Sequence, residues 1–413
     1  MSWYGTLPKQ WKALRIKNLF QLRDERNFEP LSEVRLLSLY TAIGVKPHDE
    51  IERVAGNVAV TADNYKKVYK NDIVVNIILC WQGAVGLSKW DGVTSPAYDI
   101  YKAKSDCVNV DYFNYLFRTP LFSGECYKVG RGIMAMRWRT YSNEFTAITV
   151  PLPPLPEQNQ IVRYLDWKVS GINRLINTKK KQIELLQEQK RAVVNEAVTR
   201  GGGQRIPLKH ATNNHNNMRR PIEASKRTQN SDILYDYYGA SGIIDKIDDY
   251  IFDFTTLLIA EDGANLVMRN LPLIYIATGK YWVNNHAHIL TPKNGYDLHY
   301  LAYQMEMLNY TEFITGAAQP KLSQESLNKV WIIAPPLHKQ QAIVAHLDKQ
   351  CGNIDKIIDK INTEITLLGE YRTRLVSDVV TGKIDVSGID VPEFEGVETS
   401  EDSEIEENEM EEI

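Results

Sequence analysis

The sequence predicts an α+β protein in which two mixed globular domains are joined by two long antiparallel helices. A helical segment occurs twice in the 413 residues, and a longer stretch of mixed short strands and helices precedes each copy. A chain of this length is expected to form two or three domains. Its 43% hydrophobic and 24% charged residues are typical of a soluble globular protein and exclude a disordered chain or a disulfide scaffold.

The repeated segment begins with two prolines. Residues 153–166 are PPLPEQNQIVRYLD and residues 335–348 are PPLHKQQAIVAHLD, so the offset is 335 − 153 = 182 residues. It holds without a gap to Val198 and Val380. A period this long indicates duplication of a whole module, a globular part followed by a helix, and not a solenoid. The interiors of the two globular parts show no visible match.

Each copy has the apolar spacing of an amphipathic helix. Apolar residues recur every three or four positions, as in a coiled-coil seam of about four heptads. The predicted seam residues are Ile172, Ile176, Ile183 and Leu186 in the first copy and Ile354, Ile358, Ile365 and Leu368 in the second. Two matched seams in one chain can pack on each other as an antiparallel pair with a pseudo-two-fold axis. The alternative is that each helix packs only on its own domain.

Local residues set the expected ends of these helices. Proline suits the first turn of a helix. We expect Ser170-Gly171 and Gly352-Asn353 to break each helix near its start. Gly201-Gly202-Gly203 is expected to end the first helix and to begin a flexible connector.

These features divide the chain into five segments. They are a first globular domain (1–150), a first helical repeat (151–200), a second globular domain (201–333), a second helical repeat (334–384) and an acidic, disordered tail (385–413). Residues 393–413 contain eleven Asp or Glu and no Lys or Arg. Without them, 48 basic residues face 52 − 11 = 41 acidic ones, an excess of 48 − 41 = 7 positive charges that suits a polyanionic partner.

The sequence lacks the motifs of common enzyme classes. It contains no phosphate-binding GxxxxGK[ST] motif and no Asn-Pro-Pro or Asp-Pro-Pro methyltransferase motif. His286-Ala287-His288 would place two imidazoles on one face of a strand, but no third ligand lies near in sequence. The four cysteines form no CxxC pair. We therefore expect no active site, no metal and no cofactor. No apolar stretch is long enough to cross a bilayer. The widely spaced cysteines indicate a reduced setting, so we expect a cytoplasmic protein.

Polar and basic residues of the globular parts are candidates for binding nucleic acid. Lys and Arg release counterions from phosphates, and Arg, Asn and Gln can also hydrogen-bond to base edges. The candidates are Lys46, Arg131, Arg137 and Arg139 in the first part and Arg269, Lys280, Asn284, Asn285, His286, Gln319 and Lys321 in the second. Any single one of these residues is more often solvated or structural, so only the set as a whole indicates nucleic-acid binding.

The chain resembles the specificity subunits of type I restriction-modification systems. The most specific elements are the two segments that open with PPLPEQ and PPLHKQ. Lys339 stands where the second repeat of that family usually has Glu, but the register of the repeat survives. Segments 37–45, 92–98, 237–245 and 279–288 also resemble parts of the family's target-recognition domains.

The resemblance implies a non-catalytic subunit with two target-recognition domains, each of which recognises one half of a bipartite double-stranded DNA target. The helices would act as a spacer and dock DNA methyltransferase subunits, which carry S-adenosylmethionine, and restriction motor-nuclease subunits would join them. Two rivals remain. One is the specificity subunit of a related methyltransferase-nuclease that cuts beside its site, and the other is a coiled-coil scaffold without a DNA role.

Overall fold

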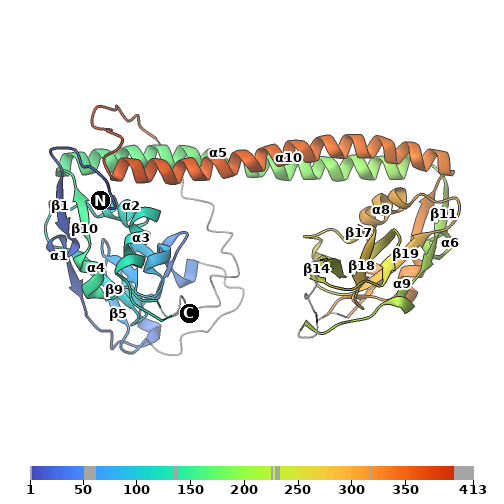
Figure 1. The fold of residues 1–413 in the computed structure, drawn as a ribbon, viewed down its shortest axis with the longest axis horizontal. Coiled ribbons are helices and arrows are strands. Elements are labelled where there is room, and N and C mark those ends of the chain that lie inside the picture. The colour runs from blue at the N-terminus through green and yellow to red at the C-terminus, as the bar shows by residue number, and fades with distance from the viewer. Residues whose placement is uncertain are drawn as a thin grey trace. The chain divides into compact units, whose positions relative to one another are not determined.

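The computed structural model describes residues 2–50, 62–133, 138–224, 227, 233–316 and 319–394, and Figure 1 shows its fold. The chain forms two compact units, unit 1 from residues 1–181 and 362–413 and unit 2 from residues 182–361. Two long helices, α5 (Leu155–Arg200) and α10 (Leu337–Val380), contribute to both. Each unit therefore holds one globular domain and a segment of the two-helix pair.

Unit 1 is built around a four-stranded antiparallel sheet. Its strands, in spatial order, are β2 (Phe20–Arg23), β9 (Tyr98–Ala103), β6 (Ile73–Asn76) and β7 (Val85–Leu87). Two-stranded pairs join β1 (Lys12–Arg15) to β10 (Thr149–Leu152), β3 (Leu37–Tyr40) to β4 (Gly44–Pro47), and β5 (Lys66–Val68) to β8 (Gly92–Thr94). The helices are α1 (Ile16–Leu19), α2 (Val110–Phe117), α3 (Pro120–Val129) and α4 (Ser142–Ala147). Five phenylalanine rings pack together between the sheet and these helices.

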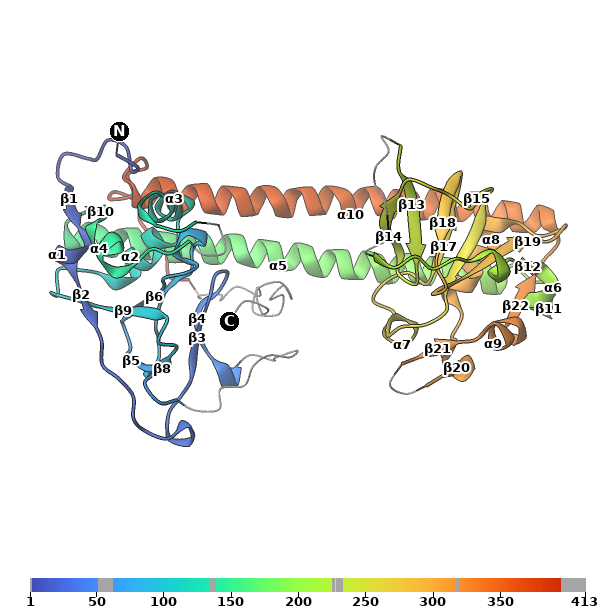
Figure 2. The ribbon, with the colours of Figure 1, turned by 60° about the horizontal axis from the view of Figure 1, so that its bottom comes forward.

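Unit 2 contains two four-stranded sheets, whose strands other than β16 are labelled in Figure 2. The first has the order β12 (Thr212–Asn214), β19 (Ala287–Pro292), β16 (Thr256–Ala260) and β17 (Ile274–Ala277). The second has the order β14 (Gly242–Ile247), β13 (Tyr235–Gly239), β18 (Lys280–Val283) and β15 (Phe252–Asp253). The shorter pairs are β11 (Gln204–Pro207) with β22 (Trp331–Ala334) and β20 (Ile314–Thr315) with β21 (Lys321–Leu322). The helices are α6 (Leu208–Ala211), α7 (Asn265–Met268), α8 (Leu298–Met307) and α9 (Gln324–Lys329).

The two globular domains share one framework although their interiors show no match in sequence. In both, a strand pair next to the long helix frames a four-stranded antiparallel sheet of the same connectivity, β2-β9-β6-β7 in unit 1 and β12-β19-β16-β17 in unit 2. A helix precedes the last strand of the pair in each case, α4 and α9. The duplication thus extends through the whole module.

A buried glutamine near the start of each long helix makes the same three hydrogen bonds in both units. The Gln158 carboxamide accepts from the backbone N–H of Asn109 (2.8 Å) and donates to the carbonyls of Cys107 (3.2 Å) and Pro153 (2.9 Å). We call these two arrangements the glutamine anchors. Their members in unit 2 are Gln340, the N–H of Asp297 (2.8 Å), and the carbonyls of Gly295 (3.2 Å) and Pro335 (2.7 Å).

Each anchored N–H belongs to the residue that caps α2 or α8, so the glutamine fixes that helix against the long one. Tyrosine hydroxyls strengthen the attachment. Tyr115 donates to Asp166 (2.7 Å) from α2, and Tyr303 donates to Asp348 (2.8 Å) from α8. The two aspartates lie at equivalent positions of the repeat.

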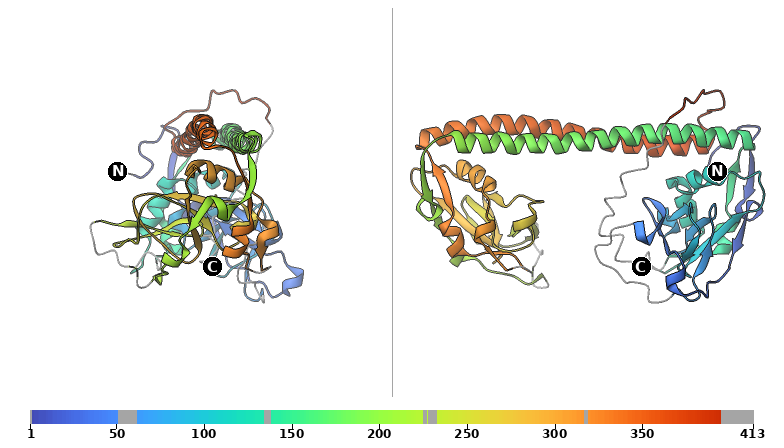
Figure 3. Two further views of the ribbon diagram at one scale, coloured as in Figure 1. Left: turned by 90° about the vertical axis from the view of Figure 1, so that its right-hand side faces the viewer. Right: turned by 180° about the vertical axis from the view of Figure 1, so that it is seen from behind.

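All eight residues of the predicted seam lie on α5 and α10 and are buried or half-buried. In unit 1, Arg372 donates to Asn173 (2.7 Å) and Lys179 pairs with Glu364. In unit 2, Lys190 pairs with Asp355 (2.7 Å). The partner number falls as the number on α5 rises, so the helices are antiparallel within each unit, where they lie side by side in the end-on view of Figure 3.

The expected helix breaks are wrong. Both α5 and α10 run without interruption through Ser170-Gly171 and Gly352-Asn353. A glycine inside a helix costs only about 1 kcal/mol, and burial of neighbouring seam residues such as Ile172 and Ile354 outweighs it. The connector also differs from expectation. Gly203 has a φ of +134°, and a side chain there would collide with the backbone of Ala334 and Pro335, so a tight turn that only glycine can make leads directly into β11.

Residues after α10 also depart from the predicted tail. Val386 and Val391 are buried in the core of unit 1, so the first part of segment 385–413 packs on the domain. The remainder, residues 395–413, lies outside the described residues.

Replacing Gln340 by Leu should destabilise unit 2 by about 2 kcal/mol, because backbone groups around it lose buried hydrogen-bond partners. Chemical denaturation followed by intrinsic fluorescence would measure the change. The matched control is Gln341→Leu at the exposed neighbouring position, which should change stability by less than about 0.5 kcal/mol. Equal effects of the two variants would contradict the role given to the anchor.

Candidate nucleic-acid interface

A polar cluster lies where β16 ends in unit 2. The backbone N–H of Glu261 donates to the carbonyl of His286 (2.9 Å), and its carbonyl accepts from the N–H of Leu322 (2.7 Å). Three segments that are distant in sequence, 261–262, 284–286 and 319–322, therefore meet at this edge. The Glu261 cluster, as we use the term, comprises Arg219, Glu261, Asp262, His286 and Lys321.

Two cations hold the central carboxylate of the cluster. Arg219 pairs with one oxygen of Glu261, and Lys321 approaches the other (3.2 Å). Arg219 also donates to the carbonyls of Asn285 and Ala287, both at 3.1 Å. The guanidinium therefore fixes the turn between β18 and β19 as well as the carboxylate.

The two histidines of His286-Ala287-His288 have different environments, contrary to the expectation that they share a strand face. His286 precedes β19, is 48% exposed at its side chain, and contacts Asp262 through Nδ1 (2.8 Å). His288 is fully buried between Asn216 (2.7 Å) and the carbonyl of Leu322 (2.7 Å). The strand begins one residue after His286, which frees that ring for the surface.

Two pKa values are shifted, one in the cluster and one in the neighbouring His288. Burial acts to raise the pKa of Glu261, but the hydrogen bond from Arg219 and the surrounding positive charges outweigh it and hold that pKa below the ordinary value. Burial lowers the pKa of His288, and its two hydrogen bonds fit a neutral imidazole that donates from Nε2. The carboxylate is therefore charged at neutral pH.

The structure brings four predicted residues of unit 2 to this edge with exposed side chains, namely Asn285, His286, Gln319 and Lys321. Asn284 is buried, and its side-chain oxygen accepts from the N–H of His286 (2.8 Å). It therefore shapes the turn and is not presented for base contact.

Two further predicted residues of unit 2 lie apart from the cluster. Arg269 donates to the carbonyls of Glu306 (2.9 Å) and Leu308 (2.8 Å), which close the end of α8. Lys280 begins β18 and lies over the Tyr250 ring at 4.4 Å, and its hydrogen bond with that tyrosine raises its pKa. Arg269 is thus structural, whereas Lys280 remains exposed.

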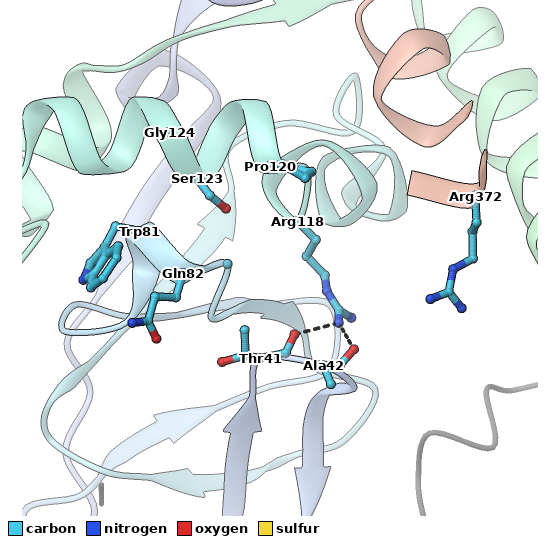
Figure 4. A pocket seen from close by; sticks show the side chains of 10 residues that line it. Thr41, Ala42, Trp81, Gln82, Arg118, Pro120, Ser123, Gly124 and Arg372 are labelled. Carbon is cyan, nitrogen blue, oxygen red and sulfur yellow. Dashed lines mark hydrogen bonds between the residues drawn. The ribbon is translucent and has the colours of Figure 1, made fainter. Parts of the chain in front are cut away.

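In unit 1, Lys46 lies on β4, 6.0 Å from the centre of the Trp90 ring. Arg118, at the end of α2, donates to the carbonyls of Thr41 and Ala42 at the tip of the β3–β4 hairpin, as Figure 4 shows. The hairpin that carries Lys46 is therefore fixed to the core of unit 1.

Arg131 and Arg139 pair with each other through their backbones (2.8 and 2.9 Å). The side chain of Arg131 is 75% exposed and lies 2.9 Å from Glu144. Next to this pair, the Trp138 ring stacks on Tyr127 at 4.9 Å. Arg137 lies outside the described residues.

Within the described ranges, no group of three or more His, Cys, Asp or Glu side chains is arranged to hold a metal ion. In the same ranges, no helix has the length and apolar character needed to span a membrane. The described surfaces carry hydrogen-bond donors, cationic side chains and aromatic rings on rigid supports. Such groups can bind a polar, anionic partner.

The chain is thus a duplicated module with a common framework and unlike surfaces. The chain belongs to the type I restriction-modification DNA specificity family, because the sequence profile of that domain matches residues 8–185 and again 202–367. It is thus a non-catalytic specificity subunit with two target-recognition domains.

Individual relatives agree with this assignment. The chain is 23% identical over 428 aligned positions to the MjaVIII specificity subunit of Methanocaldococcus jannaschii, covering 93% of this chain and 95% of the relative. A putative specificity subunit from Haemophilus influenzae is 34% identical over 142 residues, which span only 36% of that relative. A chain from a solved structure of a type I restriction-modification system has a similar fold, with a TM-score of 0.68, 15% identity and coverage of 92% of this chain and 100% of that one.

Sequence reasoning missed Arg219, Glu261 and Asp262 as members of the site. Arg219 was one of many basic residues, and nothing in the sequence distinguished it. The acidic pair directly after the buried strand Thr256–Ala260 was a usable indication, because charged residues at a strand end commonly face a polar edge.

Arg219→Ala should destabilise unit 2 by about 2 kcal/mol at neutral pH, because the Glu261 carboxylate loses a charged donor. Since the pKa of Glu261 is lowered by folding, its stabilising contribution is complete above 4.5 and is lost as the pH falls through the lower folded value. The difference between variant and wild type should therefore shrink below pH 4.5, in urea titrations repeated across pH. Arg220→Ala, at the exposed next position, is the control and should show little change.

Proposed function

We propose that the chain recognises a bipartite, asymmetric sequence in double-stranded DNA, with one domain for each half. We further propose that it positions DNA methyltransferase subunits and restriction motor-nuclease subunits on that sequence. Family membership and the duplication of the module support the proposal.

The strongest support is that the two domains are attached to the long helices in the same way but have different surfaces. Both domains are held by the same glutamine anchor and the same sheet connectivity. Beyond that framework, unit 2 carries the Glu261 cluster, whereas unit 1 carries Lys46, Arg131 and the stacked rings of Trp138 and Tyr127. A common frame with different side chains suits the recognition of two different half-sites.

Each surface has the chemistry that DNA contact needs. Exposed Lys321, Lys280 and Arg131 can contact phosphates, which sets affinity and register. Asn285, Gln319 and His286 can donate or accept at base edges, which sets specificity. Arg219 holds the backbone of Asn285 in place, which limits the entropy lost when that residue binds.

The long helices also offer apolar side chains to partner subunits. In unit 1, Leu367 and Tyr371 are exposed one turn apart on α10, and Leu175 is exposed on α5. In unit 2, Leu185 and Ile357 are exposed. Such residues lie outside the helix seam and suit docking of a protein partner.

Exchange of residues 204–334 for the equivalent domain of a relative should change one half-site and leave the other unchanged. The boundaries keep β11 and β22 together, so the strand pair stays matched. The donor should keep the residues equivalent to Asp297 and Tyr303, so that Gln340 and Asp348 retain their partners.

Mapping of methylated adenines in a host that expresses the hybrid with methyltransferase subunits would show the result. The reciprocal exchange of residues 12–152 is the matched experiment and should change the other half-site. If either exchange alters both half-sites, recognition is not divided between the domains.

A further inference from the structure

Segment 384–394, which follows α10, packs along α5 and extends to a cavity of unit 1. Gln160 donates to two carbonyls of segment 384–394 (3.1 and 2.6 Å), and Arg163 donates to a third (2.7 Å). These two residues are about one helical turn apart, so the segment follows the helix surface. It brings Phe394, the last described residue, to the wall of the cavity.

This cavity has a volume of about 560 Å³ and is lined by three cationic side chains from separate parts of the domain. They are Lys46 on β4, Lys89 in the loop after β7, and Arg118 at the end of α2. Asp111 and Asp166 also line it, and Asp166 accepts a hydrogen bond from Tyr115. The lining therefore has three cationic and two acidic side chains, one more positive than negative.

The sequence beyond Phe394 has the opposite charge. Ten of the nineteen residues 395–413 are Asp or Glu, and none is Lys or Arg. A segment tethered beside a cationic cavity has an effective concentration on the order of millimolar there. The negative charge of segment 395–413 and its attachment at Phe394 therefore both favour this segment as the occupant of the cavity.

We propose that segment 395–413 docks on this cavity and competes with DNA phosphates for Lys46 and Lys89. The inference rests on the proposed DNA binding and adds a regulatory element to it. Any duplex must displace the acidic segment before it reaches these lysines. The competition weakens the binding of every duplex, and nonspecific complexes lose most of their occupancy because they are the weakest.

The test compares the full chain with a chain that ends at Phe394, both assembled with methyltransferase subunits. Fluorescence anisotropy would give the Kd for a target duplex and for an unrelated duplex, at about 50 mM and about 200 mM salt. At the lower salt concentration, the Kd of the shorter chain for DNA should be lower than that of the full chain by a factor of about five or more. The ratio should approach one at the higher concentration, because salt screens the attraction.

Two lysine variants locate the effect, each made in both chain lengths. With Lys46→Ala, the gain from truncation should fall below about twofold. With Lys280→Ala, an exposed lysine of unit 2, the gain should remain. A full-length chain with the ten acidic residues changed to Asn and Gln should behave like the shorter chain, which separates charge from length.

Equal Kd values for the two lengths at low salt would overturn the inference. A gain that persists in Lys46→Ala, or that disappears in Lys280→Ala instead, would also overturn it, because the segment would then act elsewhere. Failure of the proposed function has a different outcome, in which neither length distinguishes the target from the unrelated duplex.

Discussion

The attachment of each recognition domain depends on one buried carboxamide. Gln158 and Gln340 each join a helix cap, a preceding carbonyl and the carbonyl of the first proline of the repeat. A carboxamide is suited to this task because it donates and accepts at once, and it carries no charge whose burial would be costly. The anchors hold α2 and α8 at the same position on the two long helices, and the sheets follow from there.

Register within the helix pair is set by polar side chains in the seam. Lys179 and Lys190 stand at positions where an isoleucine would pack well, and each finds a carboxylate on α10. A one-turn slip of α10 along α5 would separate both ion pairs, each of which contributes modestly because its members are partly exposed. The polar interruptions therefore specify one alignment, while the isoleucines and leucines supply the stability.

Sequence periodicity predicted the helices and their seam because burial on a helix follows a fixed spacing. It could not show that the domain interiors match, because only a few polar and aromatic positions persist, such as Tyr112 and Tyr115 against Tyr300 and Tyr303. Nor could it separate the structural Arg269 from exposed Lys321, since the partners of Arg269 are backbone carbonyls distant in sequence. Local spacing encodes helices well, whereas a side chain's role depends on tertiary neighbours.

The charge balance of the Glu261 cluster bears on how such a surface gains specificity. Arg219 and Lys321 already share one carboxylate, so turning either toward a phosphate removes an existing interaction. The net gain from nonspecific DNA is therefore smaller than the number of cations suggests. Asn285 and Gln319 have no charge to neutralise, and they gain only where a base edge offers matching groups. In the proposed complex with DNA, a surface of this kind would lower the background of nonspecific binding and leave discrimination to hydrogen bonds held in place by the framework.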